Sequence, residues 1–169
     1  DRSMPRTEYD LVYSSRTVIK NKYINRKVTT GFYNVDVWGD IAEKIGKYIP
    51  KDMTIYGECI GYITGSNEKL IQVKGGHKYT YGCEPGKNKI MPYRIVTVDL
   101  GKDGKPYHRE WNISEVDAWV CDMLDKNKEL EGYLTRMNIF YHGKAMNLYP
   151  DLSLENHWNE NFLERLKND

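Results

Sequence analysis

The 169-residue chain has the length of one domain, and its apolar share of 40% is enough for a single modest hydrophobic core. Its 25 basic and 24 acidic side chains give a formal net charge of +1, which excludes a protein drawn to nucleic acid or to a membrane by overall charge. Any polyanion binding must therefore come from a local patch. We expect one folded domain over residues 1–169.

Cysteine and histidine usage indicates a reducing compartment and no metal site built by the protein itself. The three cysteines are odd in number, lie far apart and form no C-x-x-C pair, so we expect reduced thiols in a cytoplasmic protein. The four histidines show neither an H-E-x-x-H pattern nor a zinc-like spacing with cysteine. No charged-then-apolar leader and no long apolar run occurs, so we expect neither secretion nor a membrane-spanning segment.

The first predicted β-structure lies between Tyr9 and Ile19, where apolar residues flank Ser14-Ser15-Arg16-Thr17. A basic stretch with few acids begins there and continues beyond it. Its basic residues are Arg16, Lys20, Lys22, Arg26 and Lys27. Such a stretch is either a solvated basic loop or a phosphate-binding surface, and composition does not decide between them.

Residues 36–49 carry apolar side chains at helical spacing, which predicts an amphipathic helix capped by Asn34 or Asp36 and stopped at Pro50. The stretch 53–63 then alternates with period two, which predicts a strand.

On that strand Glu58 shares a face with Tyr56, while Gly57 and Gly61 lie on the other face. Glycines inside a strand mark a bulge or a close approach of ligand or backbone, and we expect their missing side chains to leave room for a ligand. A carboxylate in this setting can accept two hydrogen bonds from a sugar diol or hold a hydrated divalent ion. The alternative is a strand-edge glutamate that faces water.

The second half of the chain predicts more strands and two further helices. Residues 64–89 predict loops and short strands, residues 91–100 a strand, Gly101-Lys102-Asp103-Gly104 a hairpin turn, and residues 105–111 its partner strand. A helix is predicted to start at Ser114, and another in the tail from Ser153, with Leu163 and Leu166 on its packed stripe. The fold class is therefore α+β, with largely antiparallel sheets and flanking helices.

Two further residues are candidates for nucleotide contacts. Arg16 follows two hydroxyl side chains, and its planar guanidinium suits bidentate contacts with phosphate oxygens. Tyr93 follows Pro92 at the start of a strand, where its ring could stack on a purine base. Each has an ordinary alternative, since surface arginines are common and a strand tyrosine can simply pack in the core.

Taken together, residues 9–99 resemble the middle portion of the covalent nucleotidyltransferases, the ATP-dependent RNA ligase branch in particular. Ser15-Arg16 resembles the second conserved element of that family, and Tyr56-Gly57-Glu58 resembles its glutamate element. Tyr93-Arg94-Ile95 resembles the element whose aromatic ring stacks on adenine. The resemblance implies the ligase adenylation fold, in which two sheets enclose the nucleotide.

The resemblance also implies roles for single residues. Glu58 would bind the ribose hydroxyls of ATP or AMP and a metal-bound water, Tyr93 would stack on the adenine, and Arg16 would contact the phosphate or the RNA end. Further candidates for a phosphate or RNA contact are Ser15, Lys20 and Lys22. Mg²⁺ or Mn²⁺ would accompany the triphosphate, because a bridging cation neutralises charge during phosphoryl transfer.

The chain also departs from the family. The nucleophilic lysine of the family stands in a K-x-(D/H)-G element, and none occurs here, since Lys102-Asp103-Gly104 lacks the intervening residue. We also expect the later E-G-x-x-x-(K/R) metal element and the closing K-x-K element to be absent. The sequence therefore indicates the central segment of an RNA ligase that seals 5′-phosphate to 3′-hydroxyl ends, without the lysyl-adenylate step in this segment alone.

Two other classes of function stay open at this point. A non-catalytic nucleotide-binding or RNA-binding module would use the same residues and bind ATP or AMP reversibly. A structural or partner-binding α+β domain would use Glu58 and Tyr93 only for its surface and its packing, and would show no nucleotide affinity.

Overall fold

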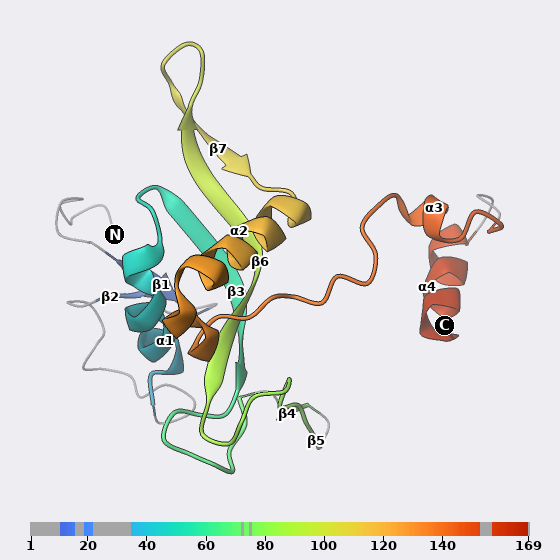
Figure 1. The fold of residues 1–169 in the computed structure, drawn as a ribbon. Helices are drawn as coiled ribbons and strands as arrows, with labels where there is room; N and C mark the ends of the chain where they lie inside the picture. The colour runs from blue at the N-terminus through green and yellow to red at the C-terminus, as the bar shows by residue number, and fades with distance from the viewer. Residues whose placement is uncertain are drawn as a thin grey trace. The chain divides into compact units, whose positions relative to one another are not determined.

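The computed structural model describes residues 11–15, 19–21, 35–71, 73–74, 76–152 and 157–168. The chain divides into two compact units, residues 1–137 and residues 138–169. Figure 1 shows the elements of both units, and we describe each unit by itself.

The first unit is built on a three-stranded antiparallel sheet in the order β3-β6-β7 (Figure 1). β3 spans Met53–Gly61, β6 spans Asn88–Leu100 and β7 spans Pro106–Glu110. The pairing of β6 with β7 begins at Leu100 opposite Pro106. Gly104 in the connecting turn has a φ of 73°, so the Asp-Gly step forms the predicted hairpin.

The first helix confirms the prediction for residues 36–49. α1 spans Val37–Ile45 and continues as a 3₁₀ turn, η2, over Gly46–Tyr48. The Asp36 carboxylate caps α1 by accepting a hydrogen bond from the Gly39 N–H at 3.3 Å. The regular structure ends before Pro50, as expected of a residue that cannot continue a helix.

The second helix begins earlier than predicted. α2 spans Ile113–Lys126, and its cap is Asn112, whereas the sequence suggested a start at Ser114. The Asn112 side chain accepts from the Glu115 N–H at 3.0 Å, and the Glu115 carboxylate accepts from the Asn112 N–H at 2.8 Å. This reciprocal capping box requires a glutamate three residues after the cap, which Asn112 has and Ser114 does not.

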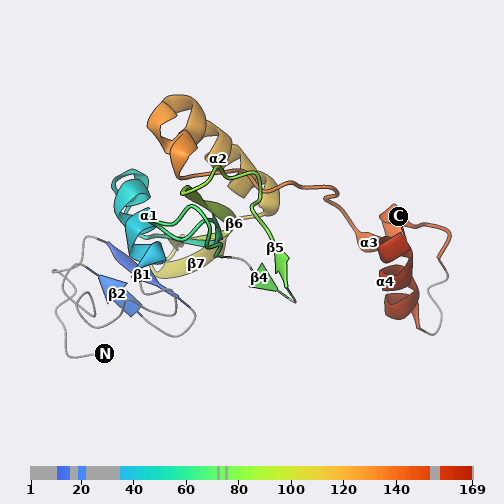
Figure 2. The same ribbon diagram turned by 90° about the horizontal axis from the view of Figure 1, so that it is seen from below.

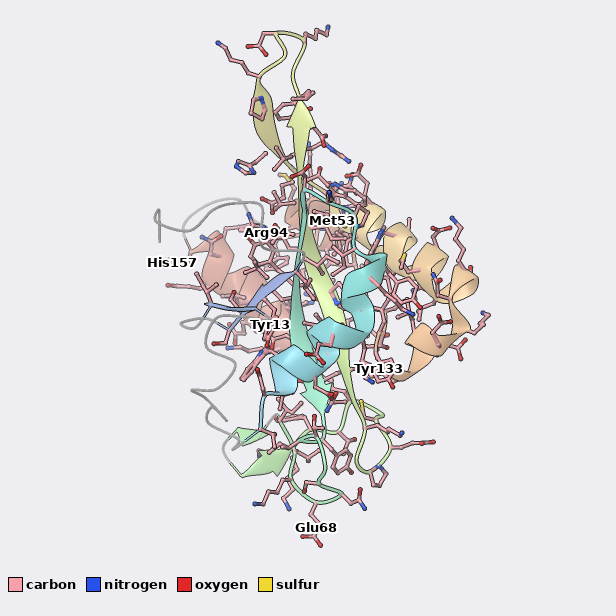
Figure 3. All side chains as sticks on the ribbon, turned by 90° about the vertical axis from the view of Figure 1, so that its left-hand side faces the viewer. Tyr13, Met53, Glu68, Arg94, Tyr133 and His157 are labelled. Carbon is pink, nitrogen blue, oxygen red and sulfur yellow. The ribbon has the colours of Figure 1, made fainter. Side chains whose placement is uncertain are left out.

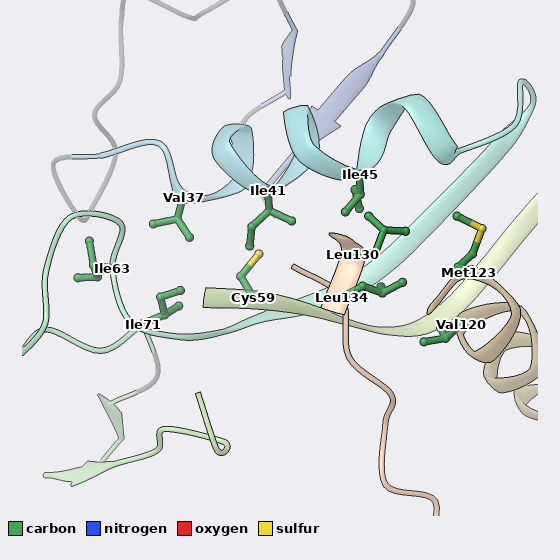
Figure 4. Close-up of a cluster of buried hydrophobic side chains, with 10 residues drawn as sticks. All are labelled: Val37, Ile41, Ile45, Cys59, Ile63, Ile71, Val120, Met123, Leu130 and Leu134. Carbon is green, nitrogen blue, oxygen red and sulfur yellow. The ribbon is translucent and has the colours of Figure 1, made fainter. Parts of the chain in front are cut away.

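A single cluster of buried side chains joins α1 and α2 to one face of the sheet (Figure 4). A 3₁₀ segment, η3 (Lys128–Gly132), and the residues after it complete the cluster. Its members are Val37, Ile41, Ile45, Cys59, Ile63, Ile71, Val120, Met123, Leu130 and Leu134. Because Cys59 belongs to this cluster, the neighbouring residue Glu58 of β3 points to the opposite face.

Two short hairpins accompany the sheet. β4 (Val73–Lys74) pairs with β5 (His77–Lys78), in agreement with the short strands predicted within residues 64–89. β1 (Val12–Ser14) lies in the predicted β-structure, whereas its partner β2 (Ile19–Asn21) extends beyond the predicted end at Ile19. The Tyr13 hydroxyl of β1 donates to the Asp36 carboxylate at 3.1 Å, which ties the first hairpin to α1. Figure 4 shows β1 and β2 on the side of α1 that faces away from the sheet, and Figures 2 and 3 show the β4-β5 hairpin on the side of the sheet opposite α2.

The second unit contains α3 (Ala145–Leu148) and α4 (Trp158–Asn168). The Phe162 ring stacks on Trp158 at 5.0 Å between ring centroids. α4 confirms a helix in the tail, but Leu163 is 52% exposed and Leu166 is 49% exposed, so the predicted packed stripe is wrong there. A unit of this size offers too few apolar partners to cover both leucines.

Candidate functional site

A β-bulge in β6 shapes the face of the sheet that turns away from α2. Tyr56 pairs with Arg94, but the next residue of β3, Gly57, pairs with Pro92, so Tyr93 is the extra residue of the bulge. Pro92 before it and Ile95 after it are both fully buried on the core side. Tyr93 and Arg94 therefore both project to the opposite side. We call this side the outer face and define it by Tyr56, Glu58, Tyr93, Arg94 and Glu110.

Glu58 and Tyr93 share the outer face. Glu58 pairs with Met91, and Tyr93 stands two residues further along β6. Residues in this diagonal relation across an antiparallel pair are about 7–8 Å apart, within reach of long and aromatic side chains. Glu58 is exposed and Tyr93 is 44% exposed. One nucleoside could therefore contact both residues, and their role in binding one stays a prediction.

Arg94 forms an ordered cluster beside Tyr93 (Figure 3 labels Arg94). Its guanidinium donates from Nε and Nη2 to the two carboxylate oxygens of Glu110, each at 2.9 Å. The same guanidinium lies 4.8 Å from the centroid of the Tyr56 ring. The hydrogen bonds with Glu110 raise the pKa of Arg94 and lower the pKa of Glu110. This exposed pair adds little stability, but it holds a planar cation at the Tyr56 ring.

The sequence did not reveal this cluster. Glu110 comes to Arg94 because Val96 pairs with Glu110 in the β6-β7 hairpin. The observed register is not that of a two-residue Asp103-Gly104 loop, which would place Glu110 opposite Thr97 on the other face of the sheet. Arg94 and Val96 alternate on the same face of β6, so a residue opposite Val96 lies diagonal to Arg94.

The glycines of β3 do not leave room for a ligand as expected. A Cβ atom at Gly57 would lie 2.7 Å from Ile90 Cγ1 and 2.9 Å from the Met91 carbonyl oxygen. At Gly61, which has a φ of 92°, it would lie 2.6 Å from the Lys87 carbonyl oxygen. β6 and the residues before it already occupy this space. The glycines instead permit a close approach of two strands at the bulge.

Cys59 lies directly behind the outer face, in the core. Burial, followed by the negative charge of Glu58, raises the pKa of its thiol to about 12. All three cysteines are free thiols, and Cys59 and Cys83 are buried.

We expect Cys59 to resist a thiol reagent in native protein at pH 8 and to react once the protein is unfolded, because only the thiolate is nucleophilic. Its pKa is about 12 in the folded chain against 9.0 for a free thiol. Its contribution to stability is therefore complete below pH 9 and is lost as the pH rises toward 12, by at most about 4 kcal/mol. Denaturant titrations of wild type and Cys59→Ala across this range measure the difference. Equal slopes against pH in the two proteins would contradict this expectation.

The other predicted contacts fall partly outside the described residues. Ser15 follows β1 and is half-buried, and the Lys20 backbone pairs with Tyr13 in the first hairpin. Arg16, Lys22 and the side chain of Lys20 lie outside the part of the chain that the structure describes. Of the predicted contacts, Glu58 and Tyr93 are thus the two that the structure brings together.

The expected absence of an E-G-x-x-x-(K/R) element is wrong. The segment Glu131-Gly132-Tyr133-Leu134-Thr135-Arg136 has this spacing, so the signal was present in the sequence. Its backbone runs along β6, where the Ile90 N–H donates to the Tyr133 carbonyl at 2.8 Å and the Thr135 N–H donates to the Ile90 carbonyl at 3.0 Å. No K-x-K triplet follows it within the 169 residues.

Both charged ends of this segment have partners. Glu131 is exposed, with Lys128 Nζ at 3.6 Å from its carboxylate. Arg136 donates from Nε and Nη2 to the Asp117 carboxylate of α2 at 2.9 and 2.8 Å, which raises the pKa of the arginine. Arg136 thus fastens the segment to α2, whereas the exposed Glu131 keeps a carboxylate at the surface.

Within the described ranges, no group of three or more His, Cys, Asp or Glu side chains is arranged to hold a metal ion. No helix among those same residues has the length and apolar character needed to cross a bilayer. No family model matches the chain, and no curated protein and no solved structure gives a significant match.

Proposed function

We propose that this chain is the central part of the adenylation domain of an ATP-dependent RNA ligase, and that its outer face binds the adenosine of ATP or AMP. The observation that carries the proposal is the shared placement of Glu58 and Tyr93 on one exposed face, on neighbouring strands. Both residues come from the elements that resemble the ligase family. Their placement on one face supports the resemblance to the ligase family, which was inferred from the order of these elements in the sequence alone.

Each residue of the outer face has a task in this proposal. The Tyr93 ring stacks on adenine, a contact worth about 1–3 kcal/mol per base in proteins that bind single strands. The Glu58 carboxylate accepts hydrogen bonds from the ribose hydroxyls, which are charge-assisted and therefore strong. Arg94 stays bonded to Glu110 and supports the ring of Tyr56. The nucleotide is thereby held by one stacking contact and one pair of directed hydrogen bonds.

A further feature supports the same proposal. The Glu131-Gly132 spacing corresponds to the metal element of the family and follows the glutamate element in the expected order.

In this proposal the divalent ion binds together with the phosphates of the nucleotide. Mg²⁺ and Mn²⁺ prefer oxygen ligands and are commonly held by one or two carboxylates together with substrate phosphates. The exposed carboxylates of Glu58 and Glu131 fit that donor type. When bound, the ion would neutralise phosphate charge, and the residues of this chain would only bind and orient the nucleotide.

The chain by itself is proposed to bind without covalent chemistry. A ligase of this type first joins AMP to a lysine, and the 169 residues contain no K-x-(D/H)-G element. The same fact favours a second candidate, a non-catalytic nucleotide-binding module. The reading frame upstream of the Asp1 codon separates the two, because a K-x-(D/H)-G element shortly before it is expected only for the ligase.

Equilibrium titration of the full chain with ATP and AMP in the presence of Mg²⁺ tests the binding. We expect saturable, reversible binding of both nucleotides. Incubation with α-labelled ATP followed by a denaturing gel should show no AMP bound to protein, because the nucleophile is missing. No affinity for either nucleotide would overturn the proposal and leave a structural α+β domain.

A further inference from the structure

Three aromatic side chains form an exposed row next to the β4-β5 hairpin. They are His77, Tyr79 and Tyr81, alternate residues that run from β5 into the turn after it, and we call them the ring row. The centroids of His77 and Tyr79 are 6.4 Å apart, and those of Tyr79 and Tyr81 are 6.1 Å apart. Each ring therefore neighbours the next one, and the three together form a continuous row.

The ring row is open to solvent. Tyr79 is 45% exposed, Tyr81 is 54% exposed, and His77 is also exposed. Neither tyrosine belongs to the hydrophobic core cluster. Packing in the core, the ordinary explanation for tyrosines in a strand, therefore does not account for either ring.

The backbone at the end of the row is unusual for its residue type. Tyr81 has a φ of 51°, in the left-handed region that disfavours bulky side chains, and Gly82 after it has a φ of 73°. Glycine or asparagine would adopt this turn at lower cost than tyrosine. A ring held on the surface in spite of that cost indicates a role for the ring itself.

The sequence around the row is basic. Residues 69–89 contain five lysines, Lys69, Lys74, Lys78, Lys87 and Lys89, against one acid, Glu84, although the chain as a whole has a net charge of only +1. Lys78 stands between two of the rings in the sequence and is exposed. Exposed rings interleaved with basic side chains are the chemistry by which proteins bind single-stranded nucleic acid without sequence preference.

The row lies on the side of the molecule that carries the candidate site. Figures 2 and 3 show the β4-β5 hairpin on the side of the sheet opposite α2, the side to which Glu58 and Tyr93 project. A strand bound on the row would therefore stay on one side of the first unit.

We propose that the ring row is a binding site for single-stranded nucleic acid, with bases stacked on Tyr79 and Tyr81 and the phosphate backbone attracted by Lys78 and its neighbouring lysines. This site goes beyond the proposed function, because it uses none of the residues of the outer face. A non-covalent stacking site requires neither ATP nor a divalent ion.

Fluorescence anisotropy with a labelled oligouridylate of about 12 nucleotides tests the site on the full chain. Removing one ring by Tyr79→Ala, or by Tyr81→Gly, which suits the left-handed turn, should raise the Kd on the order of tenfold. The double variant should raise it about 100-fold, if the two contributions add. Tyr79→Phe keeps the ring and should bind like wild type. Tyr107→Ala removes an exposed tyrosine of β7 and serves as the matched control.

A charge variant of the protein and a double-stranded probe test the site independently of the ring variants. Lys78→Ala should reduce the magnitude of the slope of log K against log salt concentration by about 0.7, the value for one phosphate contact on a single strand. A duplex of the same length should bind more weakly than the single strand, because its bases are not available for stacking.

The site would be refuted by equal affinity of wild type and the double variant for the oligouridylate, or by no binding at low salt. A loss in Tyr79→Phe as large as that in Tyr79→Ala would also refute stacking. ATP titration of Tyr79→Ala separates the two proposals, since nucleotide affinity should be unchanged there. If the alanine variant fails to fold, Tyr79→Leu keeps apolar bulk without an aromatic face and should show the same tenfold loss.

Discussion

Replacing Ile41 by alanine is expected to lower the free energy of unfolding of the first unit by about 2–5 kcal/mol. Ile41 is 2% exposed and lies on α1 in the core cluster, where it points toward the sheet near Cys59 (Figure 4). Truncation removes three methyl or methylene groups from water-free contacts and leaves a cavity between helix and sheet. Because small domains have a total stability of about 5–15 kcal/mol, this loss is large.

Chemical denaturation followed by circular dichroism measures this loss. Ile41→Val removes a single methylene and should cost only about 0.5–1.5 kcal/mol. Leu163→Ala is the matched control, since Leu163 is 52% exposed on α4 and should change stability by less than about 0.5 kcal/mol. Equal effects of Ile41→Ala and Leu163→Ala would contradict the description of the core.

The second large effect is expected on nucleotide affinity. Tyr93→Ala should weaken ATP binding about 5- to 100-fold, because a stacked ring is lost, whereas Tyr93→Phe should bind like wild type. Glu58→Ala should weaken binding by about tenfold or more, because hydrogen bonds to a carboxylate are worth about 1.5–3 kcal/mol. Isothermal titration of each variant with ATP measures these changes.

The control variants for nucleotide affinity remove the same types of side chain, a carboxylate and an aromatic ring, at positions outside the outer face. Glu68→Ala removes an exposed carboxylate from the segment after β3, and Tyr107→Ala removes an exposed ring from β7. Both should leave ATP affinity unchanged. Loss of affinity in Glu68→Ala as great as in Glu58→Ala would indicate a general charge effect and would count against a site on the outer face.

The elements that sequence periodicity predicted are those with strong local signals. α1 has an aspartate cap, an apolar stripe and a terminating proline, and all three act within a few residues of the helix. The β6-β7 hairpin follows from one Asp-Gly step. The start of α2 was predicted too late. Both Asn112 and Ser114 can cap a helix, and only Asn112 has the glutamate three residues later that completes the capping box.

The outer face depended on contacts that a single segment does not contain. The alternation of β3 correctly predicted that Glu58 and Cys59 lie on opposite faces of the strand. The bulge at Tyr93, in contrast, arises from the way β3 and β6 pair. That bulge brings Tyr93 to the face that carries Arg94, whose contact with Glu110 depends on the register of β6 with β7. Pairing registers of strands about 30 residues apart follow from tertiary packing, so propensity alone could not supply them.

Photo-crosslinking with 8-azido-ATP tests most directly whether adenosine lies on the outer face. Irradiation of the full chain, digestion and peptide mapping should place the label in the β6 peptide that contains Tyr93, and an excess of unlabelled ATP should abolish it. The Glu58→Ala variant should take up less label at the same nucleotide concentration. Labelling confined to α2 or to residues 138–169, or labelling that ATP does not compete away, would contradict the account.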